Sequence, residues 1–315
     1  MMQIPVFYHP EKLFLTDGGL ETTLIFKDHY ELPYFAAFDL LKTSDGYDSL
    51  RKYFVAYLDV AREYKTGFVL ESATWRASPD WIKKLGYPEG AVADINNKAV
   101  RMLLDLRTEY SADIENIIVS GCIGPRGDGY SPQITMTAED AGKYHLTQAK
   151  ALADSGVDLI TAITMNYVEE AEGIAAAANE LNVPVVISFT VETNGKLPTG
   201  MTLKDAIEQV DANAALRPVY YMINCAHPAH FTSELNKGLQ EGWTSRIRGI
   251  RANASRKSHA ELDESTELDR GDPHDLGTAY KQLKGRFDQL HIFGGCCGTD
   301  EEHVHEIANA VSAFY

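Results

Sequence analysis

The chain has 315 residues, of which 44% are hydrophobic and 23% are charged, and its formal net charge is −16. This composition is ordinary for a soluble globular protein, and the excess of acidic residues argues against a nucleic-acid partner, which would require a basic face. No apolar run reaches the roughly 18–20 residues that cross a bilayer, so no membrane partner is expected. Residues 1–13 lack a basic segment followed by an apolar core, and four cysteines in this length do not form a disulfide framework. A cytoplasmic protein with reduced thiols is the expectation.

Apolar runs typical of β-strands recur along the whole chain, with helical patterns between them. The runs cover residues 13–16, 68–73, 116–122, 158–164, 184–190, 219–225, 247–252 and 290–295. They are continuous rather than alternating, which is typical of parallel strands covered on both faces. About eight β/α units predict one (β/α)8 TIM barrel domain over residues 1–315. A doubly wound open sheet is the alternative, but no Gly-x-Gly-x-x-Gly follows the first run.

The segments between the runs carry helix-start signals and one long irregular stretch. Thr137 with Asp140, and Thr202 with Asp205, have the Ser/Thr-x-x-acid pattern of capped helix starts. Residues 253–277 are rich in acidic side chains and show no periodicity. We expect this stretch to be a solvated loop over the mouth of the barrel, with a metal-binding role as the weaker alternative.

A run of small and sulfur-containing residues, Gly294-Gly295-Cys296-Cys297-Gly298, follows the last apolar run. Adjacent side chains on a regular strand point to opposite faces, so both sulfurs reach one point only if the backbone leaves the pleat, which glycine permits. Cys225 ends another apolar run. In a barrel these positions all fall at the C-terminal ends of strands, where active sites of this fold lie. The sequence therefore predicts a site for a soft metal, most simply zinc.

Three thiolates around Zn²⁺ leave one coordination position open, as in catalytic sites. Such a centre is suited to binding another thiol and presenting it as a thiolate, the nucleophile needed for alkyl transfer. A closed four-ligand site, completed by Cys122, His227 or His230, is the structural alternative. A disulfide between the adjacent Cys296 and Cys297 is a less favoured one.

The combination of Asp17-Gly18-Gly19, Asn224-Cys225 with Pro228, and the Gly-Gly-Cys-Cys-Gly run resembles the homocysteine S-methyltransferase family. Residues 121–125 and 188–190 are also similar to family segments, and the resemblance spans essentially the whole chain. The resemblance implies a (β/α)8 barrel, zinc held by Cys225, Cys296 and Cys297, and methyl transfer to the homocysteine sulfur in methionine biosynthesis.

The resemblance also implies roles around the metal. Asp17 would pair with the amino group of a bound amino acid, and exposed N–H groups of Gly18 and Gly19 would meet its carboxylate. Asn224 would orient the metal site through hydrogen bonds.

Three segments depart from the family pattern. Family members usually show Phe-Glu-Thr at the end of the fourth strand, where the Glu helps to hold the amino group, whereas this chain has Ile163 in place of that Glu. Residues 71–76 (Glu-Ser-Ala-Thr-Trp-Arg) replace the commoner Thr-x-Ser/Thr-Tyr pattern, and residues 251–255 replace a Pro-Asn segment. Glu71 or Glu192 could restore the missing carboxylate; otherwise the acceptor is a thiol other than homocysteine.

The methyl donor is expected to be a small cation such as S-methylmethionine, because cobalamin or folate would require further domains. A sulfonium or quaternary ammonium can be held against an aromatic face, and Trp75 and Tyr130 lie in predicted loops at the barrel mouth. A non-catalytic zinc-binding or thiol-sensing barrel is the alternative function. The residues leave the donor, the acceptor thiol and the oligomeric state open.

Overall fold

The structure is a computed structural model that describes residues 12–88, 90–133 and 135–315. The expectation for the N-terminal segment therefore lies, up to residue 11, outside the described residues. Among the helices that are described, none combines the length and the apolar character needed to cross a membrane.

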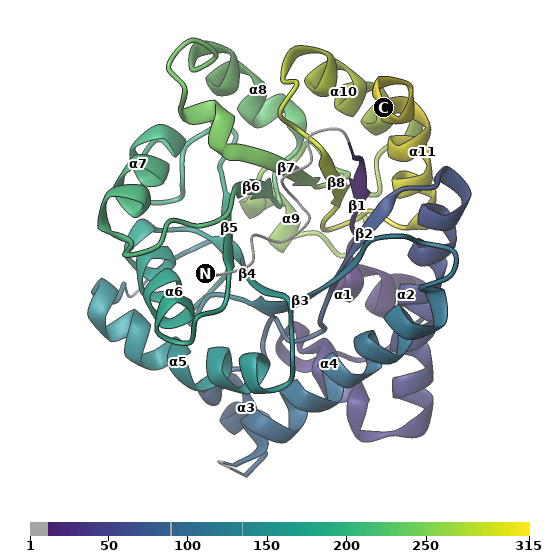
Figure 1. The fold of residues 1–315 in the computed structure, drawn as a ribbon, viewed down its shortest axis with the longest axis vertical. Coiled ribbons are helices and arrows are strands. Elements are labelled where there is room, and N and C mark those ends of the chain that lie inside the picture. The colour runs from purple at the N-terminus through teal and green to yellow at the C-terminus, as the bar shows by residue number, and fades with distance from the viewer. Residues whose placement is uncertain (1–11, 89, 134) are drawn as a thin grey trace.

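Eight parallel strands form a closed barrel in the order of the sequence, ringed by helices (Figure 1). The strands are β1 (Phe14–Leu15), β2 (Gly67–Glu71), β3 (Ile117–Ile123), β4 (Leu159–Met165), β5 (Val185–Thr190), β6 (Tyr221–Asn224), β7 (Ile247–Ala252) and β8 (Ile292–Gly295). Phe14 of β1 lies opposite both Gly67 of β2 and Ile292 of β8, which closes the cylinder. The predicted (β/α)8 barrel is thus confirmed, and each predicted run overlaps one strand.

Helices pack around the barrel between successive strands. They are α1 (Leu20–Thr22), α2 (Ser44–Tyr64), α3 (Pro79–Lys84), α4 (Ala91–Tyr110), α5 (Ala138–Asp154), α6 (Val168–Glu180), α7 (Leu203–Asn213), α8 (Pro228–Lys237), α9 (His259–Asp263), α10 (Pro273–Arg286) and α11 (Glu301–Val311). Shorter helical segments cover Thr23–Lys27, Pro33–Phe35, Ala37–Lys42, Trp243–Arg246 and Ser312–Phe314. The two predicted caps are confirmed, because Thr137 accepts a hydrogen bond from Asp140 N and Thr202 accepts one from Asp205 N.

The apolar core has two layers that meet at the strands. One fills the barrel interior with side chains from alternate strand positions, among them Phe14, Ile118, Cys122 and Met222. The other packs the outer faces of the strands against the helices. Both faces of the strands are therefore buried, which explains why the strands read as continuous apolar runs.

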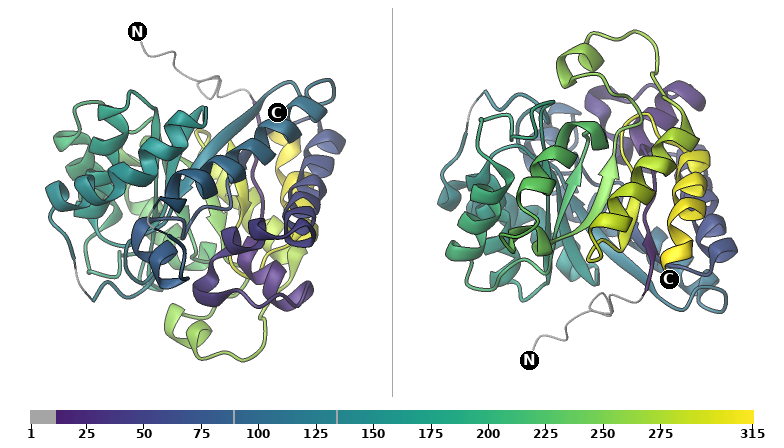
Figure 2. Two further views of the ribbon diagram at one scale, coloured as in Figure 1. Left: turned by 90° about the horizontal axis from the view of Figure 1, so that it is seen from below. Right: turned by 90° about the horizontal axis from the view of Figure 1, so that it is seen from above.

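The stretch 253–277 is more ordered than the sequence suggested. It contains α9, started by a capping box between Ser258 and Glu261, and α10 begins within it at Pro273. Its predicted position is confirmed, because Leu262, Asp263 and Asp269 line the cavity at the barrel mouth. In both views of Figure 2 this segment projects from the end of the barrel where the purple residues after β1 also lie.

Candidate metal centre and substrate cavity

Three cysteine sulfurs meet at the C-terminal end of the barrel. The Sγ atoms of Cys225, Cys296 and Cys297 all lie within 4.8 Å of one another, with Cys225 directly after β6 and the other two directly after β8. Cys225 is buried, and Cys296 and Cys297 are half-buried. Strands separated by one neighbour in the barrel therefore bring together sulfurs that are about seventy residues apart in sequence.

Local backbone geometry makes this convergence possible. Cys225 has φ +53°, a left-handed conformation that is uncommon outside glycine and that turns the chain away from the strand direction. A Cβ on Gly294 would stand 2.7 Å from Asp17 O, so glycine is required there for the close approach of β8 to β1. Gly298, with φ +80°, ends the turn that holds the two adjacent cysteines.

The sulfurs of Cys225 and Cys296 are joined as a disulfide, with their Cα atoms 5.4 Å apart, whereas Cys297 is a free thiol. The adjacent pair Cys296–Cys297, considered from the sequence, is not the pair that forms. A disulfide and a thiolate metal centre exclude each other, because metal binding needs deprotonated thiolates. The cluster can therefore bind a metal only in its reduced state.

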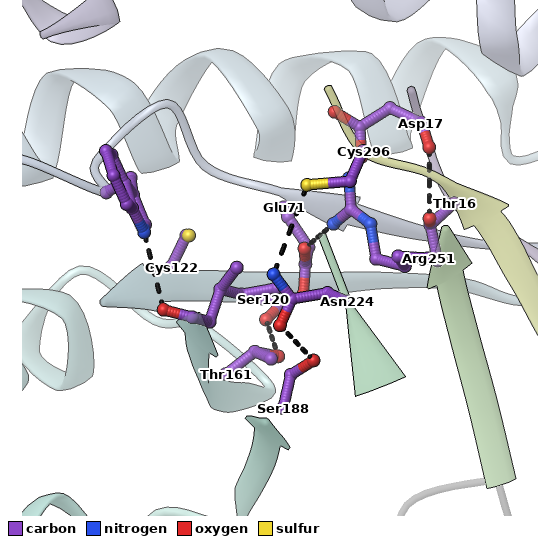
Figure 3. Close-up of polar contacts among 12 residues, drawn as sticks. Thr16, Asp17, Glu71, Ser120, Cys122, Thr161, Ser188, Asn224, Arg251 and Cys296 are labelled. Carbon is purple, nitrogen blue, oxygen red and sulfur yellow. Dashed lines mark hydrogen bonds and ion pairs between the residues drawn. The ribbon is translucent and has the colours of Figure 1, made fainter. Parts of the chain in front are cut away.

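Polar side chains contact the two adjacent cysteines. Asn224 is fully buried, and its Oδ1 accepts hydrogen bonds from Thr164 N (3.0 Å) and Ser188 Oγ (2.6 Å). Its Nδ2 thereby points to Cys296 Sγ at 4.0 Å (Figure 3). The hydroxyl of Tyr130 lies 3.5 Å from Cys297 Sγ.

None of the described residues that could supply a fourth protein ligand joins the sulfur cluster. His227 caps α8, where its Nδ1 accepts from Ala229 N, and burial lowers its pKa to about 4. His230 Nε2 contacts Arg256 O. Cys122 is a separate free thiol inside the barrel. Among the described residues, the cluster is formed by the three cysteines alone.

Burial raises the pKa of the Cys297 thiol; the charge of Glu21 adds to this effect, and the hydrogen bond with Tyr130 opposes it. A metal ion would reverse the balance, because its positive charge stabilises the thiolate. The three soft sulfur donors fit zinc in number and chemistry.

A buried charge network lies next to the sulfurs and was not predicted from the sequence. Arg251, on β7, donates through Nη1 to Glu71 Oε2 (Figure 3). Its Nη2 donates to Asp17 Oδ1 (2.6 Å), and its Nε donates to Gly295 O (3.1 Å). Tyr53 donates to the other oxygen of Asp17 at 3.0 Å. Burial raises the pKa of both carboxyls, and the guanidinium opposes that rise. With both carboxyls ionised, two carboxylates and one guanidinium leave a formal charge of −1 on side chains that are largely buried but line a cavity.

The two glycines after Asp17 do not both present exposed N–H groups to a ligand, as the resemblance implied. The N–H of Gly19 donates to Thr299 O at 3.0 Å, so it is not an exposed donor for a ligand. A Cβ on Gly18 would stand 2.6 Å from the Tyr57 hydroxyl, and Gly18 O accepts from Arg251. Both glycines line the cavity, but their main physical role is close packing of the turn after β1.

The sulfurs and the charge network share one cavity of about 430 Å³. Of the predicted substrate residues, Asp17, Glu71, Trp75 and Ile163 line it, whereas Glu192 does not. Glu192 instead contacts His259 Nδ1 at 3.1 Å, and Nε2 of that histidine donates to Cys225 O at 2.6 Å. Glu192 therefore supports the backbone of a cluster cysteine rather than the cavity wall.

Acidic side chains dominate the cavity lining. They are Asp17, Glu21, Glu71, Asp128, Asp263, Glu267 and Asp269, against the two cations Arg76 and Arg251. Burial raises the pKa of Glu21 to about 7, and the nearby charge of Asp17 contributes to the rise. Arg76, Arg251 and Glu21 were not singled out as site residues from the sequence. Arg76 and Arg251 lie in the segments that depart from the family pattern. That departure is the signal in the sequence that could have identified them.

The aromatic candidates are partly covered. Trp75 donates from Nε1 to Ile163 O at 3.3 Å and carries the guanidinium of Arg76 over its ring at 4.0 Å. Tyr130 stacks on His259 with a centroid separation of 4.0 Å. Each ring therefore has one face occupied by a protein group.

Comparisons with known proteins identify related sequences. The model of the homocysteine S-methyltransferase family matches residues 14–311. A homocysteine S-methyltransferase of Escherichia coli (strain K12) is 25% identical over 146 residues, which span 43% of this chain and 47% of that relative. Homocysteine S-methyltransferase YbgG of Bacillus subtilis (strain 168) is 22% identical over 75% of this chain and 77% of its own length.

Solved structures show the same fold. The homocysteine methyltransferase MmuM from Escherichia coli in its metallated form has a TM-score of 0.74 at 20% identity, covering 95% of this chain and 96% of that chain. Its oxidized form has the same TM-score over 94% of both chains. Fold and site together define a TIM-barrel protein with a cysteine cluster at the C-terminal strand ends. The chain belongs to the homocysteine S-methyltransferase family, a family of thiol methyltransferases.

Proposed function

We propose that the protein is a zinc-dependent methyltransferase that moves a methyl group from a small cationic donor, such as S-methylmethionine, to the thiol of homocysteine, giving methionine. Residues 1–315 would act as one catalytic barrel domain. The observation that carries the proposal is the meeting of three cysteine sulfurs at the barrel mouth, with no fourth protein ligand among the described residues. The relative MmuM has been solved in a metallated form, which supports a metal-binding role for the cysteine cluster.

Cys225, Cys296 and Cys297 would hold the zinc. When bound, the zinc lowers the pKa of a substrate thiol and keeps it as the thiolate nucleophile. Asn224 orients Cys296 through its amide, and the Glu192–His259 pair fixes the carbonyl of Cys225. The chain's own contribution is thus to hold three sulfurs close together in the wall of the cavity.

The substrate's ammonium group is assigned to the charge network. Ile163 offers no carboxylate, but Glu71 lines the same cavity, and its network with Asp17 and Arg251 retains a formal charge of −1. A buried negative charge attracts an ammonium group more strongly than an exposed one would. Glu71 therefore takes over the role of the missing fourth-strand carboxylate.

The acidic lining supports a cationic donor. Seven carboxyl side chains face two guanidinium groups around the cavity, which raises the local concentration of cations. The rings of Trp75 and Tyr130 line the same cavity and can contact a sulfonium methyl group. Because the cluster needs reduced thiols, a cytoplasmic location is part of the proposal.

The test is to reduce the full-length protein, load it with zinc, and measure methionine formation from homocysteine with S-methylmethionine or betaine as donor. The proposal requires about one zinc per chain and methionine formation that disappears when the metal is removed. Activity that survives complete chelation, or a reduced protein that binds no zinc, would refute it.

A second candidate is a zinc-binding, thiol-sensing barrel without methyltransferase activity. It is favoured by one observation: both carboxylate oxygens of Asp17 are already bonded, to Arg251 and to Tyr53. X-ray absorption at the zinc edge separates the two candidates. An enzyme shows three sulfurs and one light atom that is replaced by a fourth sulfur when homocysteine is added, whereas four protein ligands at rest would indicate the second candidate.

A further inference from the structure

Arg76 is a buried cation without a carboxylate partner. Its side chain follows β2 and is 6% exposed, and no carboxylate of the described residues lies within ion-pair distance of it. Nη1 donates to Pro125 O (3.1 Å) and Gly127 O (2.7 Å), while Nε is buried without any hydrogen-bond partner. The guanidinium lies between the rings of Trp75 and Trp81, 4.0 Å from each centroid, and it lines the cavity that contains the cysteines.

The two arginines of the cavity differ in this respect. Arg251 faces two carboxylates at contact distance, whereas Asp128 and Glu21 act on Arg76 only from farther away. Burial accordingly lowers the pKa of Arg76 to about 10, and these two carboxyls offset only part of that effect. An unpaired buried charge is costly, and a guanidinium binds carboxylates with strong, directional hydrogen bonds. A ligand that brings its own anionic group would compensate Arg76.

One of the two backbone donors expected to hold a substrate carboxylate is already bonded to a protein group. The N–H of Gly19 is bonded to Thr299 O, and Gly18 O accepts from Arg251. The turn after β1 therefore offers fewer donors than the resemblance implied. Arg76 lines the same cavity, and its buried Nε–H has no hydrogen-bond partner.

We propose that Arg76 is a specificity-determining residue that binds the carboxylate of a substrate in this cavity. The proposal rests on the proposed function, whose substrates, the acceptor homocysteine and the donors S-methylmethionine and betaine, all carry a carboxylate. Neutral or purely cationic ligands of the same size would bind more weakly. The shared chemistry is the carboxylate, and the experiment decides whether it belongs to the acceptor or to the donor.

The experiment measures binding rather than turnover. Homocysteine, S-methylmethionine and betaine, and the decarboxylated analogue of each, are titrated separately into the reduced, zinc-loaded full-length protein. Binding is followed by calorimetry and by tryptophan fluorescence, since two of the three tryptophans flank Arg76. In the wild type, loss of the carboxylate should weaken at least one ligand about tenfold to a hundredfold. In Arg76→Gln the same loss should change affinity by less than about twofold.

The control is Arg126→Gln. Arg126 lies on the same loop as Gly127 but pairs with Asp80 and does not line the cavity, so its replacement should preserve the discrimination. Arg76→Lys, which keeps the charge but not the planar fork, should retain part of it. This variant also replaces the Gln variant if the latter fails to fold.

Two results would overturn the proposal. One is a wild-type protein that binds every ligand and its decarboxylated analogue within twofold. The other is an Arg76→Gln protein that weakens both members of each pair equally, as expected if Arg76 only packs between the tryptophans. If the preference for carboxylate-bearing ligands depends on Arg76 but no methionine forms, the proposed function alone is rejected. If methionine forms but that preference does not depend on Arg76, the role of Arg76 alone is rejected.

Discussion

The sulfur side and the charged side of the cavity are held together by opposite means. Around the cysteines, polar contacts are long: Tyr130 lies 3.5 Å from Cys297, and Asn224 lies 4.0 Å from Cys296. Around Arg251, each charge meets an opposite charge at short distance in a fully buried setting. Once its disulfide is reduced, the sulfur side leaves its sulfur atoms free for an incoming metal and ligand, whereas on the charged side both carboxylates are already paired with Arg251.

The difference separates chemistry from positioning. In the reduced state, loosely held thiols can exchange their protons for a metal, which requires little reorganisation of the protein. A compensated ion network is rigid and keeps a fixed charge pattern, which suits the orientation of a substrate. Changes on the sulfur side should therefore abolish activity without unfolding the protein, and changes on the charged side should mainly affect stability and substrate binding.

The largest effect is expected for Cys297→Ser. This change removes one of three ligands, so zinc should be lost and methyl transfer should fall about a thousandfold or more, with the fold intact. Zinc content by atomic emission and methionine formation are the measurements. The matched variant is Cys122→Ser, a buried cysteine outside the cluster, which should keep its zinc. Equal zinc loss in both variants would contradict the assignment of the ligands.

Arg251→Met should instead destabilise the protein. It leaves Asp17 and Glu71 buried without their cation, at a cost of about 3–5 kcal/mol. Burial already raises the pKa of both carboxyls, so the folded variant binds more protons than the unfolded chain. Its stability should therefore be higher at pH 5 than at pH 8. Urea unfolding at both pH values measures this.

The double variant Glu71→Gln/Arg251→Met sharpens the test. It removes one of the two uncompensated carboxylates, so it should recover part of the lost stability. A double variant as unstable at pH 8 as the single one would show that Arg251 acts through packing rather than charge.

The sequence predicted the barrel and the sulfur trio because both depend on local patterns. Continuous apolar runs identify parallel strands, and the fold rule places strand ends at one mouth, so Cys225 and Cys296 could be brought together without coordinates. The sequence also contains the start signal of α9, because Ser258 and Glu261 have the spacing of a capping box. The segment is so acidic and aperiodic that no helix was predicted there.

The charged side could not be predicted in the same way. Arg251 lies on β7, and its partners lie on β2 and directly after β1, so their contact depends on the register of the closed barrel and on the direction of one long side chain. Residues 71 and 251 were both noticed as departures from the family pattern. That the two are partners in one ion pair becomes visible only in three dimensions.

A smaller effect is expected from Glu21, which lies between the two sides. Burial raises its pKa to about 7, so it is largely protonated at pH 6 and largely charged at pH 8. Binding of S-methylmethionine should strengthen about threefold to tenfold over this interval, and Glu21→Gln should flatten the profile. Glu267, an exposed residue of the cavity lining, serves as the control. Its replacement by Gln should leave the pH dependence of S-methylmethionine binding unchanged. A profile that stays steep in Glu21→Gln would assign the titration to another group.

The smallest effect concerns the loop that covers both sides. Ser258 caps α9, and the next residue, His259, donates to Cys225 O. Ser258→Ala should cost about 1 kcal/mol of local stability, because the capping box is lost while the barrel is untouched. Hydrogen exchange should accelerate about fivefold in α9 and in the flanking residues of the loop, with global unfolding almost unchanged. Thr137→Ala removes a cap of similar type from α5, on the outer layer, so it should accelerate exchange there and leave α9 protected. If Ser258→Ala instead lowered global stability as much as Arg251→Met, the loop would be part of the barrel's cooperative core, and the distinction between a rigid charged side and an adaptable sulfur side would fail.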